Sequence, residues 1–187
     1  MKKLLIIPVL LMSILNPGHA VNLSGTVFEK VGIEKDIDPH LLYAVALAES
    51  AYSPNKKARG AAPYPWTLRL PERPIYATSK NDAEQQLSKV LTYTSAVDVG
   101  LMQVNVRWHK HRVKHARDLL DPETNVRVGA DILLENLKRY PNDLIAALGR
   151  YHSSRVDRRN QYGLTVYYIY QNLKLSWAFF LLWTHTL

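Results

Sequence analysis

The chain lacks cysteine altogether, and neither of its apolar runs is as long as a membrane span. The absence of thiols excludes disulfide bonds, thiolate nucleophiles and cysteine-ligated metal sites. The two most apolar stretches, residues 4–15 and 175–187, both fall short of the ~20 residues that a membrane-spanning helix needs. Acidic residues are also scarce: 16 aspartates and glutamates oppose 24 lysines and arginines, which gives a formal charge of +8. A basic protein attracts anionic polymers, membrane head groups or nucleic acid, and charge alone does not choose among them.

The 187 residues fit one ordinary domain, or one domain with an insertion. An apolar fraction of 47% is enough for a packed core, and 21% charged residues argue against global disorder.

Residues 1–20 have the pattern of a secretory signal peptide. Two lysines precede a short apolar run that ends at Pro17 and Gly18, and the small residues Gly18 and Ala20 suit cleavage. We therefore expect an exported, periplasmic protein of a bacterial envelope, with a mature chain that begins near Val21. An uncleaved membrane anchor is the alternative interpretation.

The mature chain is expected to be mostly helical. Asp-Pro pairs at Asp38 and Asp121 predict helix starts, because aspartate caps a helix and proline suits its first position. The helix after Asp38 is apolar on nearly every side, so it should be buried. The expected helices cover residues 39–51, 81–93, 122–140, 144–152 and about 160–173.

Residues 55–94 are predicted to form an insertion beside the main core. Their first half is rich in proline, lysine and arginine, and "WTLRL" and "IYATS" flank "PERP". This pattern predicts a small, poorly covered β-hairpin. The fold class is therefore mainly α (α+β): a domain at residues 21–174 with an inserted hairpin, followed by an apolar tail at residues 175–187.

Glu49 is the candidate reactive group. It ends the apolar stretch "LLYAVALAES", where Leu42, Val45 and Ala46 share its helix face. Apolar surroundings and the negative end of the helix dipole both favour the protonated carboxyl. A proton held in an apolar pocket is what general acid catalysis of glycosidic cleavage needs. The alternative is a helix that simply ends, with Glu49 turned into solvent.

Three stretches in order make the pattern more specific: "ALAES" at 46–50, "VGLMQVN" at 99–105 and "ALGRYHSS" at 147–154. Together they resemble the soluble lytic transglycosylase (SLT) domain of the lysozyme-like fold, over roughly residues 37–168. In particular, the chain looks like the small specialised members associated with conjugation, secretion or pilus machines. The stretch "PYPWTL" is also similar to what mobile-element versions carry.

This resemblance implies that Glu49 is the single acid/base of a peptidoglycan-cleaving enzyme. It would protonate the oxygen between N-acetylmuramic acid and N-acetylglucosamine, then accept the proton of the muramic acid 6-hydroxyl as an anhydro ring closes. No water is consumed and no cofactor is required. The resemblance further implies that Ser50 and Gln103 hydrogen-bond near the cleaved sugar, that Met102 lines the groove, and that Tyr151 helps to position the glutamate.

The chain departs from the family pattern at three places. The family often shows Tyr-Asn-x-Gly where this sequence has Tyr151-His152-Ser153-Ser154, so His152 stands where an asparagine contact is usual. No proline follows the "GLMQ" stretch. The insertion after Ser50 is long, so it could cover or narrow the groove.

Two other functions stay open at this stage. Asp98 could act as a second carboxylate that activates water, as in an inverting hydrolase or a goose-type lysozyme. A catalytically silent protein that binds the wall or serves as a scaffold is the other alternative. The two enzymes differ in product, since only the transglycosylase leaves an anhydro sugar.

Residues 107–117 form a basic run that holds His109, His111 and His115 among many cations. The surrounding positive charge disfavours a metal site there. The preferred interpretation is a solvated basic face that meets wall polymer or envelope machinery. No nucleic-acid-binding motif is present. The apolar tail is expected to pack on the core or fray, and membrane contact through Trp177 and Trp183 stays open.

Overall fold

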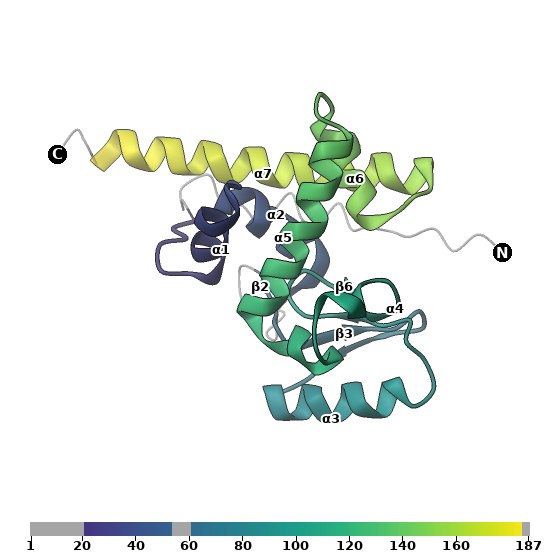
Figure 1. Cartoon of the computed structure of the whole chain (residues 1–187). Helices are drawn as coiled ribbons and strands as arrows, with labels where there is room; N and C mark the ends of the chain where they lie inside the picture. The colour runs from purple at the N-terminus through teal and green to yellow at the C-terminus, as the bar shows by residue number, and fades with distance from the viewer. Residues whose placement is uncertain (1–20, 54–60, 185–187) are drawn as a thin grey trace.

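The protein is mainly helical with two small β-sheets, which confirms the predicted fold class (Figure 1). The computed structural model describes residues 21–53 and 61–184, with side chains up to residue 175, so the predicted signal peptide lies outside the described residues. The helices are α1 (Val27–Lys35), α2 (Pro39–Ser50), α3 (Lys80–Leu91), α4 (Val106–His109), α5 (Pro122–Arg139), α6 (Leu144–His152) and α7 (Val156–Thr184). The strands are β1 (Ala51–Tyr52), β2 (Ala62–Pro63), β3 (Thr67–Arg69), β4 (Pro74–Tyr76), β5 (Asp98–Val99) and β6 (Val104–Asn105).

Helix α2 is buried, as its apolar sequence predicts. Leu42, Val45 and Ala46 are completely inaccessible to solvent, and α1 and α7 both pack against this helix. The predicted start is confirmed, since Asp38 Oδ1 accepts a hydrogen bond of 2.8 Å from the backbone N–H of His40. The burial of α2 fixes the direction in which its last turn points.

Helices α5 and α6 also begin where the sequence predicts. Asp121 caps α5 by accepting a hydrogen bond from the N–H of Thr124 (2.9 Å), and Asp143 caps α6 through the N–H of Ala146 (2.8 Å). Each cap satisfies one of the N–H groups that the first turn of a helix leaves unpaired.

Two glycines allow α6 and α7 to cross at close range. A Cβ atom on Gly149 of α6 would overlap the carbonyl oxygen of Arg159, and a Cβ atom on Gly163 of α7 would overlap that of Ile145. Because the backbones approach so closely, the end of α6 and the first half of α7 form one rigid corner of the molecule.

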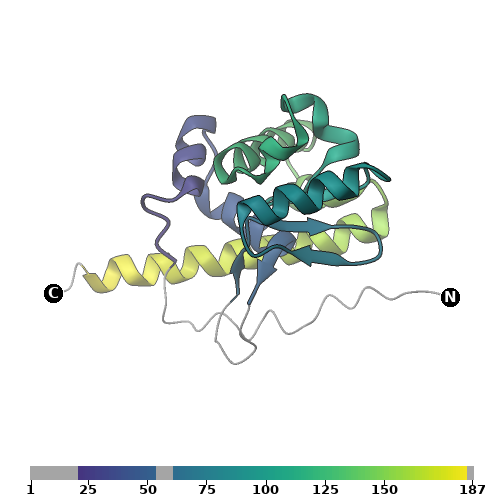
Figure 2. The same ribbon diagram turned by 90° about the horizontal axis from the view of Figure 1, so that it is seen from below.

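Helix α7 is longer than expected. The sequence predicts a helix at about 160–173, whereas α7 runs from Val156 to Thr184 and passes through the boundary of the predicted tail. No proline or glycine follows Gly163, so nothing in the sequence stops the helix. Its C-terminal end projects beyond the other helices in both views, and Leu175 there is 57% exposed (Figures 1 and 2). Trp177 and Trp183 lie outside the described side chains.

The four-stranded sheet has the order β4-β3-β5-β6, with every neighbouring pair antiparallel. The predicted hairpin is confirmed as β3–β4, but the expectation that it is poorly covered is wrong. Thr67 and Leu68 of β3 are completely buried, and Leu87 and Val90 of α3 pack in the same apolar core. Helix α3 lies alongside the sheet and covers it (Figure 2). Within residues 61–94 the chain therefore forms part of the main core.

None of the helices in the described part of the chain combines the length and the apolar character needed to cross a membrane.

Candidate active site

A groove of about 1010 Å³ lies where the end of α2, the β5–β6 pair, α5 and the α6–α7 corner meet. Its lining is rich in charged and aromatic side chains, which include Glu49, Arg69, Asp98, Trp108, Tyr151 and His152. Ligand sites are concave surfaces of this kind, with a few polar groups that converge on one place. The predicted catalytic residue, Glu49, therefore lines this groove.

Glu49 stands in the last turn of α2, and its side chain is only 11% exposed. The carboxyl thus points into the groove wall, and the alternative of a glutamate turned into bulk solvent is wrong. One residue from outside α2 fixes the end of the helix, since Arg69 Nη2 donates a hydrogen bond of 3.3 Å to the backbone oxygen of Glu49.

His152 faces this carboxyl from the end of α6. Its Nδ1 atom lies 3.7 Å from Glu49 Oε1, which is within ion-pair distance, and its side chain is 40% exposed. The imidazole stacks on the ring of Tyr162, with centroids 4.6 Å apart and ring planes 5° from parallel. Interaction with Glu49 raises the pKa of His152, against the opposing effect of burial.

Tyr162 carries an unsatisfied polar group into the same corner. Its hydroxyl is buried and has no hydrogen-bond partner among the described residues. Burial and the nearby Glu49 carboxylate raise the pKa of Tyr162 well above the ordinary value. Buried polar groups are usually paired, so an orphaned hydroxyl beside a reactive carboxyl is typical of a functional site.

Asp98 of β5 is the second carboxyl in the groove. Its Oδ1 atom accepts a hydrogen bond of 2.7 Å from Asn105 Nδ2 across the β5–β6 pair. Burial raises the pKa of Asp98, and the neighbouring Glu49 carboxylate raises it further. The groove therefore holds two carboxyls, and the Glu49 carboxylate influences the ionisation of Asp98.

The turn at residues 100–103 is built from satisfied polar groups. Gly100 has a φ of +79°, and a Cβ atom there would overlap the amide of Asn125. Asn125 lies in α5 and is 1% exposed; its Oδ1 accepts from Met102 N–H, and its Nδ2 donates to Val99 O and Leu119 O, each at 2.8 Å. Only glycine fits a backbone this close to another side chain, which explains the "VGLMQ" pattern physically.

Two of the predicted substrate-binding residues, Ser50 and Met102, are buried within the fold. Ser50 is 1% exposed, and its hydroxyl donates to Leu101 O (2.7 Å) and Ala46 O (3.1 Å), so it joins α2 to the turn. Met102 is 0% exposed and packs against α5 at Gly129. Neither side chain reaches the groove surface, because both face the core side of the turn. The predicted roles of Ser50 and Met102 toward a sugar stay predictions, and neither residue is among those that line the groove.

Gln103 and Tyr151 do line the groove. Gln103 has a φ of +45°, and its Nε2 donates to Gly100 O (2.9 Å) and Thr67 O (3.2 Å), so both of its N–H groups are used within the fold. The hydroxyl of Tyr151 donates to Met102 O (2.8 Å). Burial, Glu49 and Asp98 together raise the pKa of Tyr151 well above the ordinary value. These two side chains fix the shape of the groove beside the glutamate.

Sequence reasoning missed Arg69, Trp108 and Tyr162. Arg69 is an exposed residue between the buried Leu68 and Leu70, and its proximity to Glu49 depends on how the sheet is paired. Trp108 was considered only as part of the basic run, whereas it is 68% exposed at the groove, where its flat ring suits the apolar face of a sugar. Tyr162 had no local signal, since only the α6–α7 crossing brings it to the site.

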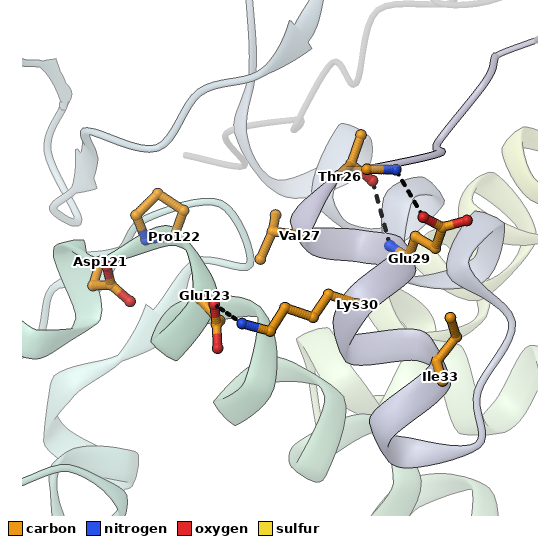
Figure 3. Close-up of a pocket in the computed structure, with 9 residues that line it drawn as sticks. Thr26, Val27, Glu29, Lys30, Ile33, Asp121, Pro122 and Glu123 are labelled. Atoms are coloured by element: carbon orange, nitrogen blue, oxygen red, sulfur yellow. Dashed lines mark hydrogen bonds and ion pairs between the residues drawn. The ribbon is translucent and has the colours of Figure 1, made fainter.

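A second hollow of about 500 Å³ lies between the starts of α1 and α5 (Figure 3). Its polar side chains serve the fold: Thr26 caps α1, Glu29 accepts a hydrogen bond of 2.7 Å from Gly25 N–H, and Lys30 bonds Glu123 at 2.8 Å. Because these groups are paired within the fold, the groove at Glu49 is the candidate active site.

The basic run is partly held against α5. Arg112 donates to His109 Nδ1 (3.3 Å) and to Glu135 (2.8 Å). Burial lowers the pKa of His109, and the nearby Arg112 acts in the same direction. Over the described side chains, no three His, Asp or Glu residues are grouped closely enough to hold a metal ion.

The sequence matches one known family model. Residues 26–166 match the family model described as the transglycosylase SLT domain. Searches of curated proteins and of solved structures gave no match. The match spans most of the chain and covers α1 to the middle of α7, so it contains every residue of the groove described above. The chain belongs to the transglycosylase SLT domain family.

Proposed function

We propose that this protein is a peptidoglycan lytic transglycosylase that cleaves the β-1,4 bond between N-acetylmuramic acid and N-acetylglucosamine, with Glu49 as its acid/base. The observation that carries the proposal is the position of Glu49: a carboxyl that is 11% exposed, at the end of a buried helix, in a groove of about 1010 Å³. Membership in the SLT family supports peptidoglycan as the substrate.

The chemistry needs one group that both gives and takes a proton. Protonated Glu49 donates its proton to the glycosidic oxygen, and the bond from that oxygen to C1 of the muramic acid breaks. The Glu49 carboxylate then accepts the proton of the 6-hydroxyl, whose oxygen attacks C1 and closes the 1,6-anhydro ring. The proton count is unchanged and no water enters, so the bound sugar supplies its own nucleophile.

The surrounding residues have defined roles in this proposal. Gln103 and Tyr151 hold the turn that forms the groove wall beside Glu49. Gln103 Oε1, which accepts a long hydrogen bond of 3.4 Å from Arg69, retains capacity to accept one from a sugar hydroxyl or N-acetyl N–H. Trp108 supplies an exposed aromatic face for a sugar ring.

Hydrolysis is the second candidate function, because Asp98 lies in the same groove and interacts electrostatically with Glu49. In an inverting hydrolase, a second carboxylate activates water on the face of the sugar opposite the acid. Burial raises the pKa of Asp98 on balance, whereas the hydrogen bond from Asn105 acts in the direction of the charged form that such a base needs. A silent protein that only binds the wall is disfavoured by the unsatisfied groups around Glu49.

The cellular role that we propose is local opening of the wall, outside the cytoplasm, for a transfer or secretion apparatus. The resemblance to the specialised family members and the predicted signal peptide support this role. The projecting end of α7 and the basic run at residues 107–117 are the surfaces that we assign to contacts with such machinery or with the membrane surface.

The decisive experiment is digestion of purified peptidoglycan with the wild-type protein and with Glu49→Gln, followed by mass spectrometry of the soluble fragments. We expect anhydro ends, lighter by one water than reducing ends, from the wild type and none from the variant. Reducing ends from the wild type would instead establish hydrolysis, and Asp98→Asn would then abolish cleavage. No cleavage by a folded wild type would support the silent scaffold.

A further inference from the structure

The proposed first step needs a protonated glutamate, whereas a glutamate carboxyl in water is ionised above about pH 4.3. Glu49 is nearly enclosed at 11% exposure, so solvent has limited access to its carboxyl. The residue that does reach both solvent and this carboxyl is His152, at 40% exposure. It occupies the position where the family pattern often has an asparagine, which cannot carry a proton.

We propose that His152 is a positioning residue that shares one proton with Glu49, so that the pair, and not the glutamate alone, retains the acid proton at neutral pH. The inference rests on the proposed function and names the group that prepares Glu49 for it. The Nδ1–Oε1 distance of 3.7 Å needs to shorten by only about 0.5–1 Å to reach hydrogen-bond range. The proton then moves from Nδ1 to Oε1, leaving a neutral imidazole and a carboxylic acid.

The imidazole is held in the orientation that this transfer requires. Its nearly parallel stack on Tyr162 fixes the ring plane, and Tyr162 is itself 5% exposed and fixed by the close α6–α7 crossing. The stacked ring leaves the Nδ1 edge directed at Glu49. The unpartnered Tyr162 hydroxyl lies in the same corner and is a donor available to the carboxylate that forms when Glu49 has given up its proton.

The charges around His152 favour retention of the proton. Glu49 from α2 and Asp98 from β5 both stabilise the imidazolium, whereas Arg158 from α7 opposes it. The net effect is a raised pKa for His152, so the pair loses its last proton above the ordinary histidine value of about 6.5. Two groups this close share protons as a pair, so the proton that His152 retains stays available to Glu49.

The proton balance closes over a turnover. Glu49 receives the proton from His152, gives it to the glycosidic oxygen, recovers one from the 6-hydroxyl, and shares it again with neutral His152. No proton is taken from or released to water. In an asparagine variant no neighbouring side chain can supply Glu49 with a proton, so cleavage should fall more steeply with rising pH than it does in the wild type.

The kinetic test measures kcat/KM for release of anhydro ends from peptidoglycan between pH 4 and 9, for the wild type and for His152→Asn. We expect the alkaline limb of the variant to move to lower pH, so that its loss relative to the wild type is at least about tenfold greater at pH 7.5 than at pH 5. His40→Asn, a half-buried histidine in the first turn of α2 and outside the groove, is the control and should keep the wild-type profile. A His152→Asn profile that parallels the wild type at every pH would overturn the inference while leaving the proposed function intact.

An NMR titration tests the pairing without any activity. We expect the titration midpoint of the His152 ring to lie above 6.5 in the wild type and to fall by at least about half a unit in Glu49→Gln, because the partner charge is gone. Tyr162→Phe, which keeps the stack but removes the hydroxyl, should leave the midpoint close to the wild-type value. Equal midpoints in the wild type and Glu49→Gln would refute the shared proton, whatever reaction the groove performs.

Discussion

Helix α2 has a carboxylate at each end, and the two differ in their hydrogen bonds. Asp38 at the N-terminal end accepts hydrogen bonds at both oxygens, from His40 N–H (2.8 Å) and from the Tyr170 hydroxyl (2.7 Å). The Glu49 carboxyl at the C-terminal end lies 3.7 Å from His152 Nδ1, which is ion-pair distance but too long for a hydrogen bond. The helix dipole favours the charge of Asp38 and disfavours that of Glu49.

The ionisation of Asp38 follows from its bonds. Burial alone would raise the pKa of Asp38, but the hydrogen bonds from Tyr170 and His40 lower it on balance. These hydrogen bonds hold Asp38 in its charged form, and they stabilise the fold. A carboxyl that must exchange a proton needs to be free of such bonds. We therefore expect substitutions near Asp38 to lower stability and substitutions of Glu49 to lower activity.

The largest effect should come from Glu49→Gln. We expect the rate of anhydro-end release to fall by about 10³-fold, since the variant has no group to donate or accept the proton. The free energy of unfolding should stay within about 0.5 kcal/mol of the wild type, because no well-formed hydrogen bond is lost. Urea denaturation and product analysis on the same samples measure both quantities. A large loss of stability would contradict the contrast between the two ends of α2.

The next largest effect should be a loss of stability when the turn at residues 100–103, beside Glu49, loses its hydrogen bonds. Asn125→Leu removes three hydrogen bonds that hold the turn, so the free energy of unfolding should fall by about 3 kcal/mol. Urea denaturation measures this change.

Asn136→Leu is the matched control in the same helix. Asn136 is also buried but makes one side-chain hydrogen bond, to Ile132 O (3.1 Å), so about 1 kcal/mol is expected. Equal losses in the two variants would show that the turn does not depend on Asn125.

Local sequence signals were sufficient to predict where most of the helices begin and to single out Glu49 as the candidate acid. The Asp-Pro caps determine where α2 and α5 begin, and the position of Glu49 at the end of an apolar helix is a property of a single stretch. Those signals act over one or two helix turns, so the sequence exposes them directly. The hairpin at β3–β4 was also predicted, since its two strands are neighbours along the chain.

The directions of side chains on the turn were not predictable in the same way. Ser50 and Met102 face the core because Asn125 and Gly129, from a helix more than twenty residues further on, determine how the turn is seated. Tyr162 reaches Glu49 only through the α6–α7 crossing. Each of these placements depends on a contact between distant segments, which periodicity and capping patterns do not encode.

The smallest effect tests the structural carboxylate through its partner. Tyr170→Phe removes the hydroxyl that bonds Asp38 Oδ2, and we expect a loss of about 1 kcal/mol in the free energy of unfolding at pH 7. Because the folded-state pKa of Asp38 is lowered, this contribution is present above the unfolded value of about 3.9 and is lost as pH falls through the lower folded value.

The difference between Tyr170→Phe and the wild type should therefore shrink in urea titrations below about pH 4. Tyr168→Phe, at a 54% exposed position on the same helix, should change stability by less than about 0.5 kcal/mol at any pH. Cleavage per folded molecule should be unchanged in Tyr170→Phe, because Glu49 lies at the opposite end of α2 from Asp38. A loss of cleavage with no loss of stability would mean that the Tyr170–Asp38 hydrogen bond at the start of α2 helps to position Glu49 at its end. The two carboxylates would then act together.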